Sequence, residues 1–241
     1  MASNNDNLPA YQEKQPFTDI TAPRSGSITG PVQTCSIRDN QVNYLTIVRD
    51  SAKSYHIALT VDPTPLYRIE LTSPSKVGDI QIFSASDSGL PAIAAARLLP
   101  LTKSKGQPVA TICTYSPALP DALWRPVTRT TSFSFPKYQS DIPVVSVPGR
   151  AATPRPLTWK TGGTVEPFFE LWWDNPLPLV PTSGFQKDQR GSEYKFATFA
   201  RKTGEGEDNL LEIRRGGGLD FELSVILELF IILHFNNVEL I

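Results

Sequence analysis

The chain has 241 residues, and its 23 Lys and Arg residues nearly balance 24 Asp and Glu residues, which gives a formal net charge of -1. A protein whose main partner is a nucleic acid would be expected to be strongly basic, so this balance argues against that class. The length suits one large all-β domain with a tail. Only two cysteines occur, so a disulfide framework is not expected.

Residues 1–40 are rich in Asn, Gln, Ser, Thr, Pro and Gly, and their few large apolar side chains follow no regular period. This composition predicts a disordered N-terminal tail, followed by a single domain over residues 41–241. The first residues lack the basic and apolar regions of a secretory signal, and no Asn-x-Ser/Thr acceptor occurs in the sequence. We therefore expect a cytoplasmic protein.

From Tyr44 onward, short runs of β-branched and aromatic residues alternate with Pro, Gly, Asp and Ser, which is typical of many antiparallel strands. The expected strands are 43–49, 55–61, 66–71, 79–83, 92–97, 109–115, 130–135, 156–160, 168–173, 194–201 and 210–214. Two stretches rich in Pro, Gly and Ser, 138–155 and 174–190, are expected to be long loops. Adjacent Trp172 and Trp173 cannot both face inward on a strand, so one is expected outside the core.

The segment 219–235 follows three glycines and is apolar on nearly every side when it is drawn as a helix. Such a helix must be enclosed by protein or by lipid. Crossing a bilayer takes about 20 mostly apolar residues, whereas the uninterrupted apolar part here is shorter and includes Ser224, Glu228 and His234. We therefore expect no transmembrane span, and a helix that is enclosed by the domain itself.

Asp220, Ser224 and Glu228 are spaced four residues apart, so they should form one narrow polar stripe along this helix. A buried Glu228 must either gain a raised pKa through desolvation or find a partner. A hydrogen bond to a strand is the favoured role for Glu228, and orienting a ligand is the alternative. For His234, a hydrogen-bonded structural histidine is favoured over a proton switch.

No motif for enzymatic chemistry stands out. Gly-x-Ser-x-Gly and Gly-x-x-x-x-Gly-Lys-Ser/Thr are absent, so hydrolase and phosphate-loop chemistry have no support. The two histidines, His56 and His234, lie outside His-Glu-x-x-His and Cys-x-x-Cys contexts. We expect no catalytic residue, no metal site and no cofactor.

Three local patterns accompany this order of strands and helix. They are Leu157-Thr158-Trp159-Lys160, Phe196-Ala197-Thr198-Phe199 followed by Arg201-Lys202, and Leu210-Leu211-Glu212-Ile213 with Gly216 to Leu219 leading into the helix. With them, the chain from Tyr44 to Leu240 resembles the tubby C-terminal-like superfamily, which includes phospholipid scramblases and LURP-one-related proteins, and looks closest to uncharacterised fungal members. The resemblance implies a mainly β fold, a closed antiparallel barrel of about 12 strands around a central hydrophobic C-terminal helix at about 219–235.

Charge is unevenly distributed along the chain. Residues 101–160 carry eight basic and two acidic side chains, whereas residues 161–241 carry seven basic and thirteen acidic ones. If the basic residues of the first group converge on one face, they would favour an anionic membrane surface. The alternative is that alternating strand faces scatter them round the barrel. The candidate lipid- or anion-binding residues of this group are Lys103, Lys105, Arg125, Arg129 and Lys137.

Arg214 and Arg215 form a second candidate anion site, because a helix N-terminus follows them closely. The alternative role of this segment is structural. Its glycines accept unusual backbone conformations, so they can turn the chain from an outer strand into the barrel.

These observations predict a non-enzymatic binding module that associates peripherally with anionic phospholipid, such as a phosphoinositide, or with a protein partner. Tubby-related members of the superfamily bind phosphoinositides through basic side chains, but none of those residues can be aligned onto this chain. The alternatives are binding of a small apolar ligand, or an enzyme that uses carboxylates near Glu228. Lipid scrambling would need a membrane-embedded path, and no segment of this sequence is long enough to supply one.

Overall fold

The computed structural model describes residues 42–72, 78–86, 89–101, 106–131, 136–145, 151–162, 168–173, 194–201, 209–214, 218–238 and 240. The expected N-terminal tail at 1–40 and the expected loop at 174–190 lie outside these residues.

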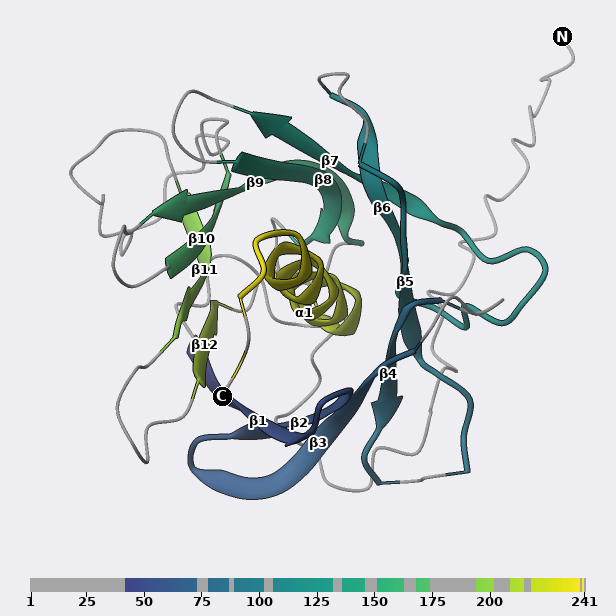
Figure 1. Cartoon of the computed structure of the whole chain (residues 1–241), viewed down its shortest axis with the longest axis vertical. Helices are drawn as coiled ribbons and strands as arrows, with labels where there is room; N and C mark the ends of the chain where they lie inside the picture. Colours follow the sequence, from purple (N-terminus) through teal and green to yellow (C-terminus); the bar gives the residue numbers. More distant parts are fainter. Residues whose placement is uncertain are drawn as a thin grey trace, which may run out of the picture.

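Twelve antiparallel strands close into one barrel, and a C-terminal helix lies inside it (Figure 1). Each strand pairs with its neighbours in sequence, and β1 closes the ring by pairing with β12. The strands are β1 (Val42–Ser51), β2 (Ser54–Leu59), β3 (Asp62–Leu71), β4 (Ile80–Ser84), β5 (Ala94–Leu98), β6 (Pro108–Cys113), β7 (Arg125–Thr131), β8 (Pro136–Val144), β9 (Thr153–Gly162), β10 (Phe168–Trp173), β11 (Tyr194–Ala200) and β12 (Asn209–Arg214). The helix is α1 (Gly218–Phe235). The predicted fold class is confirmed.

Most strands lie where the sequence predicts them, but β7 and β8 differ. The pattern places a strand at 130–135, whereas β7 ends at Thr131 and begins as early as Arg125. The predicted loop at 138–155 is wrong at both of its ends, because β8 extends to Val144, β9 begins at Thr153, and β8 pairs with both β7 and β9. Both β7 and β8 carry polar side chains at positions that face α1, and these hide the apolar alternation expected of a strand.

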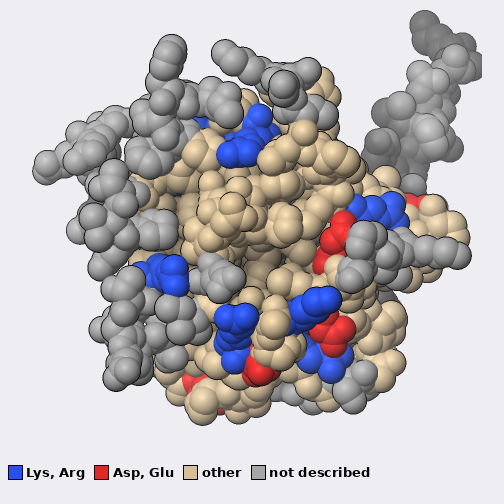
Figure 2. All heavy atoms as spheres, in the orientation of Figure 1, with Lys and Arg blue, Asp and Glu red and all other residues tan. Residues whose placement is uncertain are grey.

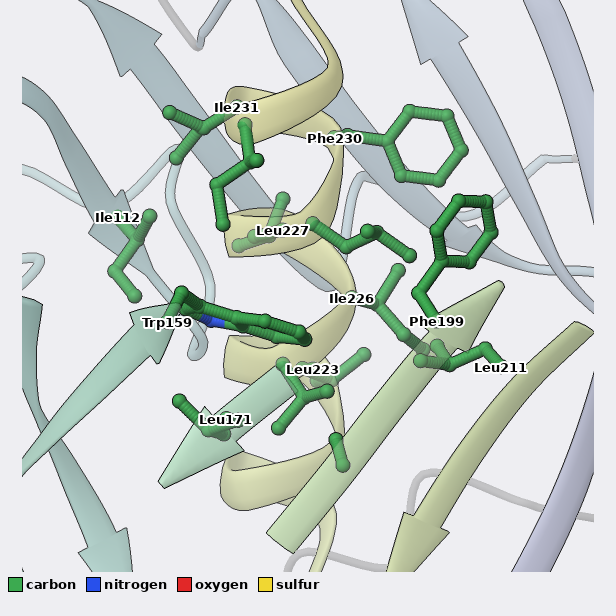
Figure 3. Packing of buried hydrophobic residues seen from close by; sticks show 14 of the residues in the cluster. Ile112, Trp159, Leu171, Phe199, Leu211, Leu223, Ile226, Leu227, Phe230 and Ile231 are labelled. Carbon is green, nitrogen blue, oxygen red and sulfur yellow. The ribbon is translucent and has the colours of Figure 1, made fainter. Parts of the chain in front are cut away.

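The helix α1 fills the axis of the barrel. Every residue from Phe221 to Leu233 except Glu222 is buried. Figure 3 shows apolar side chains of α1 packed among residues of the wall, such as Trp159 and Phe199. Burying one large apolar side chain is worth about 1.5–3 kcal/mol, so the helix contributes much of what holds the wall in place. Among the described residues, no helix combines the length and the hydrophobicity that crossing a bilayer requires.

The chain turns into the barrel at Gly218, which has a backbone φ of 79°. This conformation costs glycine little and other residues considerably more. Asp220 follows in the first turn of α1, where a carboxylate interacts favourably with the positive end of the helix dipole. The helix therefore begins within one residue of the predicted start.

Successive connections alternate between the two ends of the barrel, because neighbouring strands are antiparallel. We call the end where α1 begins the entry end and the opposite end, where α1 finishes, the exit end. At the entry end, Arg125 at the start of β7 donates a hydrogen bond to Ser224 in α1. At the exit end, Asn236 just after α1 donates from Nδ2 to the hydroxyl of Tyr138 near the start of β8, at 3.3 Å.

Candidate functional site

One side of α1 is polar and faces β8 and β9. Glu228 is only 1% exposed, and its two carboxylate oxygens accept hydrogen bonds from Ser140 Oγ on β8 and from Trp159 Nε1 on β9, the latter at 2.9 Å. Burial raises the pKa of Glu228 to about 7, although both hydrogen bonds and the charge of Arg125 oppose this shift. The predicted structural hydrogen bond between Glu228 and a strand is confirmed.

Arg125 continues this polar contact toward the entry end. Its Nη2 donates to Ser224 Oγ at 2.8 Å and to Thr114 Oγ1 at 3.2 Å, and its Nη1 donates to the carbonyl oxygen of Asp141 at 3.0 Å. Burial lowers the pKa of the Arg125 guanidinium, while neighbouring carboxylates act against that change. Arg125 thus connects α1 to β7, β8 and the segment that follows β6.

Asp220 stands at the outer end of the polar stripe and is exposed at the barrel mouth. Its carboxyl group still has a raised pKa because of partial burial, and Arg125 and a hydrogen bond with Thr114 oppose the shift. Ser224 Oγ donates to the carbonyl oxygen of Asp220 at 2.6 Å. Asp220, Ser224 and Glu228 therefore share one side of α1, as their spacing predicts.

This polar side is a closed set of hydrogen bonds. Both oxygens of Glu228 already have protein donors. In the part of the chain that the structure describes, no group of three or more His, Cys, Asp or Glu residues is placed to hold a metal ion. Buried polar networks whose members are satisfied rigidify the elements that carry them. The arrangement can therefore orient α1 against the wall.

Those of the predicted basic residues that the structure describes do not form one cluster. Arg125 contacts α1 inside the entry end, whereas Lys137 is exposed at the exit end. Arg129 lies close to the exit end, and its guanidinium carbon is 5.8 Å from the centroid of the Tyr138 ring. Of the three members of the first group that the structure describes, Arg129 and Lys137 lie at the same end and Arg125 lies at the other.

Arg214 lies half-buried at the entry end, with its Nε 4.0 Å from Glu212 Oε1. It is separated from Lys137 by the length of the barrel. Lys103, Lys105 and Arg215 lie outside the described residues, so their part in an anion site stays a prediction.

Charge is instead segregated along the axis of the barrel when each described charged residue is assigned to the nearer end of its strand. The exit end has the basic residues Arg49, Lys53, Arg68, Arg129, Lys137, Lys160 and Arg201 and the acidic residues Asp50, Glu70 and Asp79. The entry end has the basic residues Arg97, Arg125, Arg155 and Arg214 and the acidic residues Asp62, Asp121, Asp141, Glu212, Asp220 and Glu222, with Arg97 assigned here because its guanidinium lies over Trp124 beside the start of β7. Lys195 Nζ lies 3.2 Å from Glu170 Oε1, so this pair is counted at neither end. Figure 2 views the exit end, where Lys and Arg side chains gather over β1–β3 and over β7–β9.

Some charged groups of the exit end have polar partners. His56 Nδ1 and Asp50 Oδ1 are hydrogen-bonded at 2.6 Å, and Arg68 Nε forms an ion pair with Glu70 Oε1 at 3.4 Å. Lys53 is exposed in the β1–β2 turn of the same end. The basic excess at the exit end therefore persists after these pairs are formed.

Sequence reasoning missed Arg49, Lys53 and Arg68 because they precede the basic stretch at 101–160. In a barrel of antiparallel neighbours, every second connection lies at the same end. These residues are found when charges are grouped by the end of the barrel at which each connection lies, and not by position along the chain.

The adjacent tryptophans point to opposite faces, as predicted. Trp173 is buried, with its ring centroid 6.5 Å from that of Phe196. Trp172 is half-buried, and the ammonium groups of Lys160 and Lys195 lie 5.1 and 5.8 Å from its ring centroid. Trp172 is therefore covered by charged side chains on the outside of the wall.

His234 is exposed at the end of α1, and its ring centroid lies 5.2 Å from that of Phe235. It stands outside the core. Its predicted role as a hydrogen-bonded structural histidine has no support in the described contacts.

Comparison with known proteins finds no matching family model, no matching curated protein and no matching solved structure.

Proposed function

We propose that this protein is a non-catalytic binding module that docks the exit end of its barrel on an anionic phospholipid surface. One observation carries the proposal: among the described residues, basic side chains outnumber acidic ones at the exit end, and the reverse holds at the entry end. A Lys or Arg near an anionic membrane surface contributes about 1 kcal/mol. A few such residues at one end are therefore enough for peripheral association.

The position of the basic residues suits a broad, flat partner. Lys53 and Lys137 are both exposed, and the groups to which they belong lie on different sides of the barrel mouth (Figure 2). Exposed apolar side chains, Leu101 and Phe168, accompany them at the same end. Basic and apolar groups together are the combination that holds a peripheral protein at a headgroup region.

We further propose that the chain is a tubby C-terminal-like protein. The closed barrel around one apolar helix is the architecture that the sequence resemblance implies, and it supports this assignment. The lipid-docking proposal does not depend on it, because that proposal rests on the charges of the exit end.

The two alternative functions have less support. A small apolar ligand would need room at the axis of the barrel, where the side chains of α1 are packed against the wall (Figure 3). A carboxylate enzyme would need Glu228 to reach a substrate, yet Glu228 is buried and both of its oxygens accept hydrogen bonds from protein groups. We therefore assign Glu228 an orienting role.

Co-sedimentation with vesicles tests the docking proposal. The full chain should bind vesicles that contain phosphatidylserine, should not bind pure phosphatidylcholine, and should bind more weakly as salt rises. A parallel set with a phosphoinositide shows whether headgroup charge alone decides the affinity. The double variant Lys53→Glu with Lys137→Glu should lower partitioning by at least about tenfold.

The matched control reverses two charges at the other end of the barrel. The double variant Asp62→Lys with Asp121→Lys raises the net charge as much as the first variant lowers it. It should leave partitioning within about twofold of the wild type, because the entry end points away from the membrane. Absence of binding to anionic vesicles at low salt, or equal binding by the wild type and the exit-end variant, would refute the proposal.

A further inference from the structure

The segment Tyr115–Trp124, between β6 and β7 at the entry end, contains hydrogen-bonded turns and exposes large apolar side chains. Tyr115 is 54% exposed, Leu119 is 49% exposed and Leu123 is 84% exposed. Two turn hydrogen bonds shape the segment, from the Leu119 amide to the Ser116 carbonyl oxygen at 3.0 Å and from the Ala122 amide to the Leu119 carbonyl oxygen at 3.2 Å. A fixed, exposed apolar group of this kind is typical of a contact surface.

Contacts at the C-terminal end of this segment hold it against the barrel. The guanidinium carbon of Arg97 lies 3.8 Å from the centroid of the Trp124 ring. Arg125, the next residue, donates the three hydrogen bonds that connect it to Thr114, Asp141 and α1. The apolar side chains are therefore presented on a rigid support, which lowers the entropic cost of binding.

A complementary surface exists on the opposite end of the same molecule. Leu99 and Leu101, in the connection between β5 and β6, are exposed at the exit end. This connection and the segment Tyr115–Trp124 both adjoin β6, so they lie on one wall of the barrel at its two ends. Shifting one copy along the barrel axis therefore brings the apolar segment of one copy toward the apolar connection of the next.

Charge reinforces this match. Asp62 and Asp121 are exposed at the entry end, where acidic residues outnumber basic ones among the described residues. Lys53 and Lys137 are exposed at the exit end, where the balance is the opposite. Opposite potentials on two docking faces steer encounter and disfavour the reversed orientation, because like ends repel.

We propose that the partner of the segment Tyr115–Trp124 is a second copy of this chain, which associates head to tail through its exit end. The interface is heterologous, so it leaves one unused surface at each end of a pair and allows further copies to add. This inference goes beyond lipid docking and shares the exit end with it. A membrane and a second copy therefore compete for that end.

Sedimentation equilibrium of the full chain tests the inference. The average mass of the wild type should rise with protein concentration and fall when salt is raised from about 0.05 M to about 0.5 M. An entry-blocked variant, Leu119→Asp with Leu123→Asp, should remain a monomer. An exit-blocked variant, Leu101→Asp with Lys137→Glu, should also remain a monomer. Circular dichroism and thermal unfolding verify that both variants fold, and every changed side chain is exposed in the wild type.

Mixing the two blocked variants is the decisive step. Each retains the surface that the other has lost, so an equimolar mixture should form a one-to-one dimer and nothing larger. A wild type that stays monomeric at all concentrations overturns the inference, as does a blocked variant that still self-associates or a mixture that stays monomeric. Lipid docking is judged separately: a monomeric wild type that still binds anionic vesicles removes only the head-to-tail contact.

Discussion

The two sides of α1 hold the helix in different ways. On the apolar side, Phe221 packs against Phe196 of β11 and Phe230 packs edge-on against Tyr55 of β2, with ring centroids 5.4 and 5.2 Å apart. On the other side, polar groups of α1 meet Arg125, Ser140 and Trp159 in hydrogen bonds. Apolar burial is non-directional, whereas hydrogen bonds require alignment. The apolar side therefore supplies most of the stability, and the polar side sets the rotation of α1 about its own axis.

The largest effect is expected on the apolar side. Phe230→Ala removes a buried ring in contact with Tyr55 and should lower the free energy of unfolding by about 3–5 kcal/mol. Chemical denaturation at fixed pH measures the loss. Leu123→Ala, at an exposed position, is the control and should stay within about 0.5 kcal/mol of the wild type. If both variants lose equally little, Phe230 does not lie in a packed core.

The polar side should appear in the pH dependence of stability. Glu228 has a folded-state pKa of about 7 against an ordinary value of 4.5. The folded protein therefore binds more protons between these values, so this stabilisation is complete below pH 4.5 and is lost as pH rises through about 7. The shift corresponds to about 3 kcal/mol.

Glu228→Gln should remove that part of the pH profile, so its stability relative to the wild type should rise as pH increases from 4.5 to above 7. Unfolding free energies at several pH values measure this. Asp121→Asn, at an exposed carboxylate, should keep the wild-type profile. A glutamine variant that runs parallel to the wild type would show that Glu228 is not the buried group that titrates.

A smaller effect isolates one hydrogen bond of the polar side. Trp159→Phe keeps most of the buried ring and removes the N–H that donates to Glu228, so it should cost about 1–3 kcal/mol. The cost should be greater at pH 8 than at pH 5, because the donor favours the ionised carboxylate. Denaturation of this variant at both pH values provides the comparison. Equal costs would mean that the loss reflects packing alone.

The smallest effect is expected at the first turns of α1, near the entry end of the barrel. Tyr67 donates from its hydroxyl to Glu222 Oε1 at 2.5 Å, and this bond is partly buried. Tyr67→Phe should cost about 1 kcal/mol, since the freed carboxylate is rehydrated. Thermal or chemical unfolding can resolve this. A cost comparable to that of Phe230→Ala would contradict the conclusion that the apolar side of α1 supplies most of the stability.

The contrast between the two sides also explains what could be predicted from the sequence. The strands that face the apolar side of α1, such as β10 and β12, show clear alternation and were located within a residue. The strands β7 and β8 face the polar side, where Arg125 and Ser140 stand at positions that a strand normally fills with apolar residues. Their partners in α1 lie 99 and 88 residues away along the chain, so no local pattern could reveal them.

Some features of the candidate site could likewise be predicted from local sequence, and others could not. The polar stripe of α1 follows from helical spacing and was predicted, and so was a hydrogen bond between Glu228 and a strand. A raised pKa of Glu228 was one of the two predicted consequences of its burial. The inward position of Arg125 depends on a contact with Ser224 across the barrel, which local sequence does not contain. The basic exit end depends on which connections share an end, so it required the closed order of strands.

The central claim is that the wall of the barrel encloses α1, because this enclosure fixes the positions of both the entry end and the exit end. Hydrogen–deuterium exchange measures the enclosure most directly. Amides from Phe221 to Leu233 should be among the slowest to exchange, slower than those of the exposed segment Tyr115–Trp124, and anionic vesicles should not change their rates. Exchange of these amides as fast as that of the exposed segment, or protection that arises only when vesicles are added, would contradict the account.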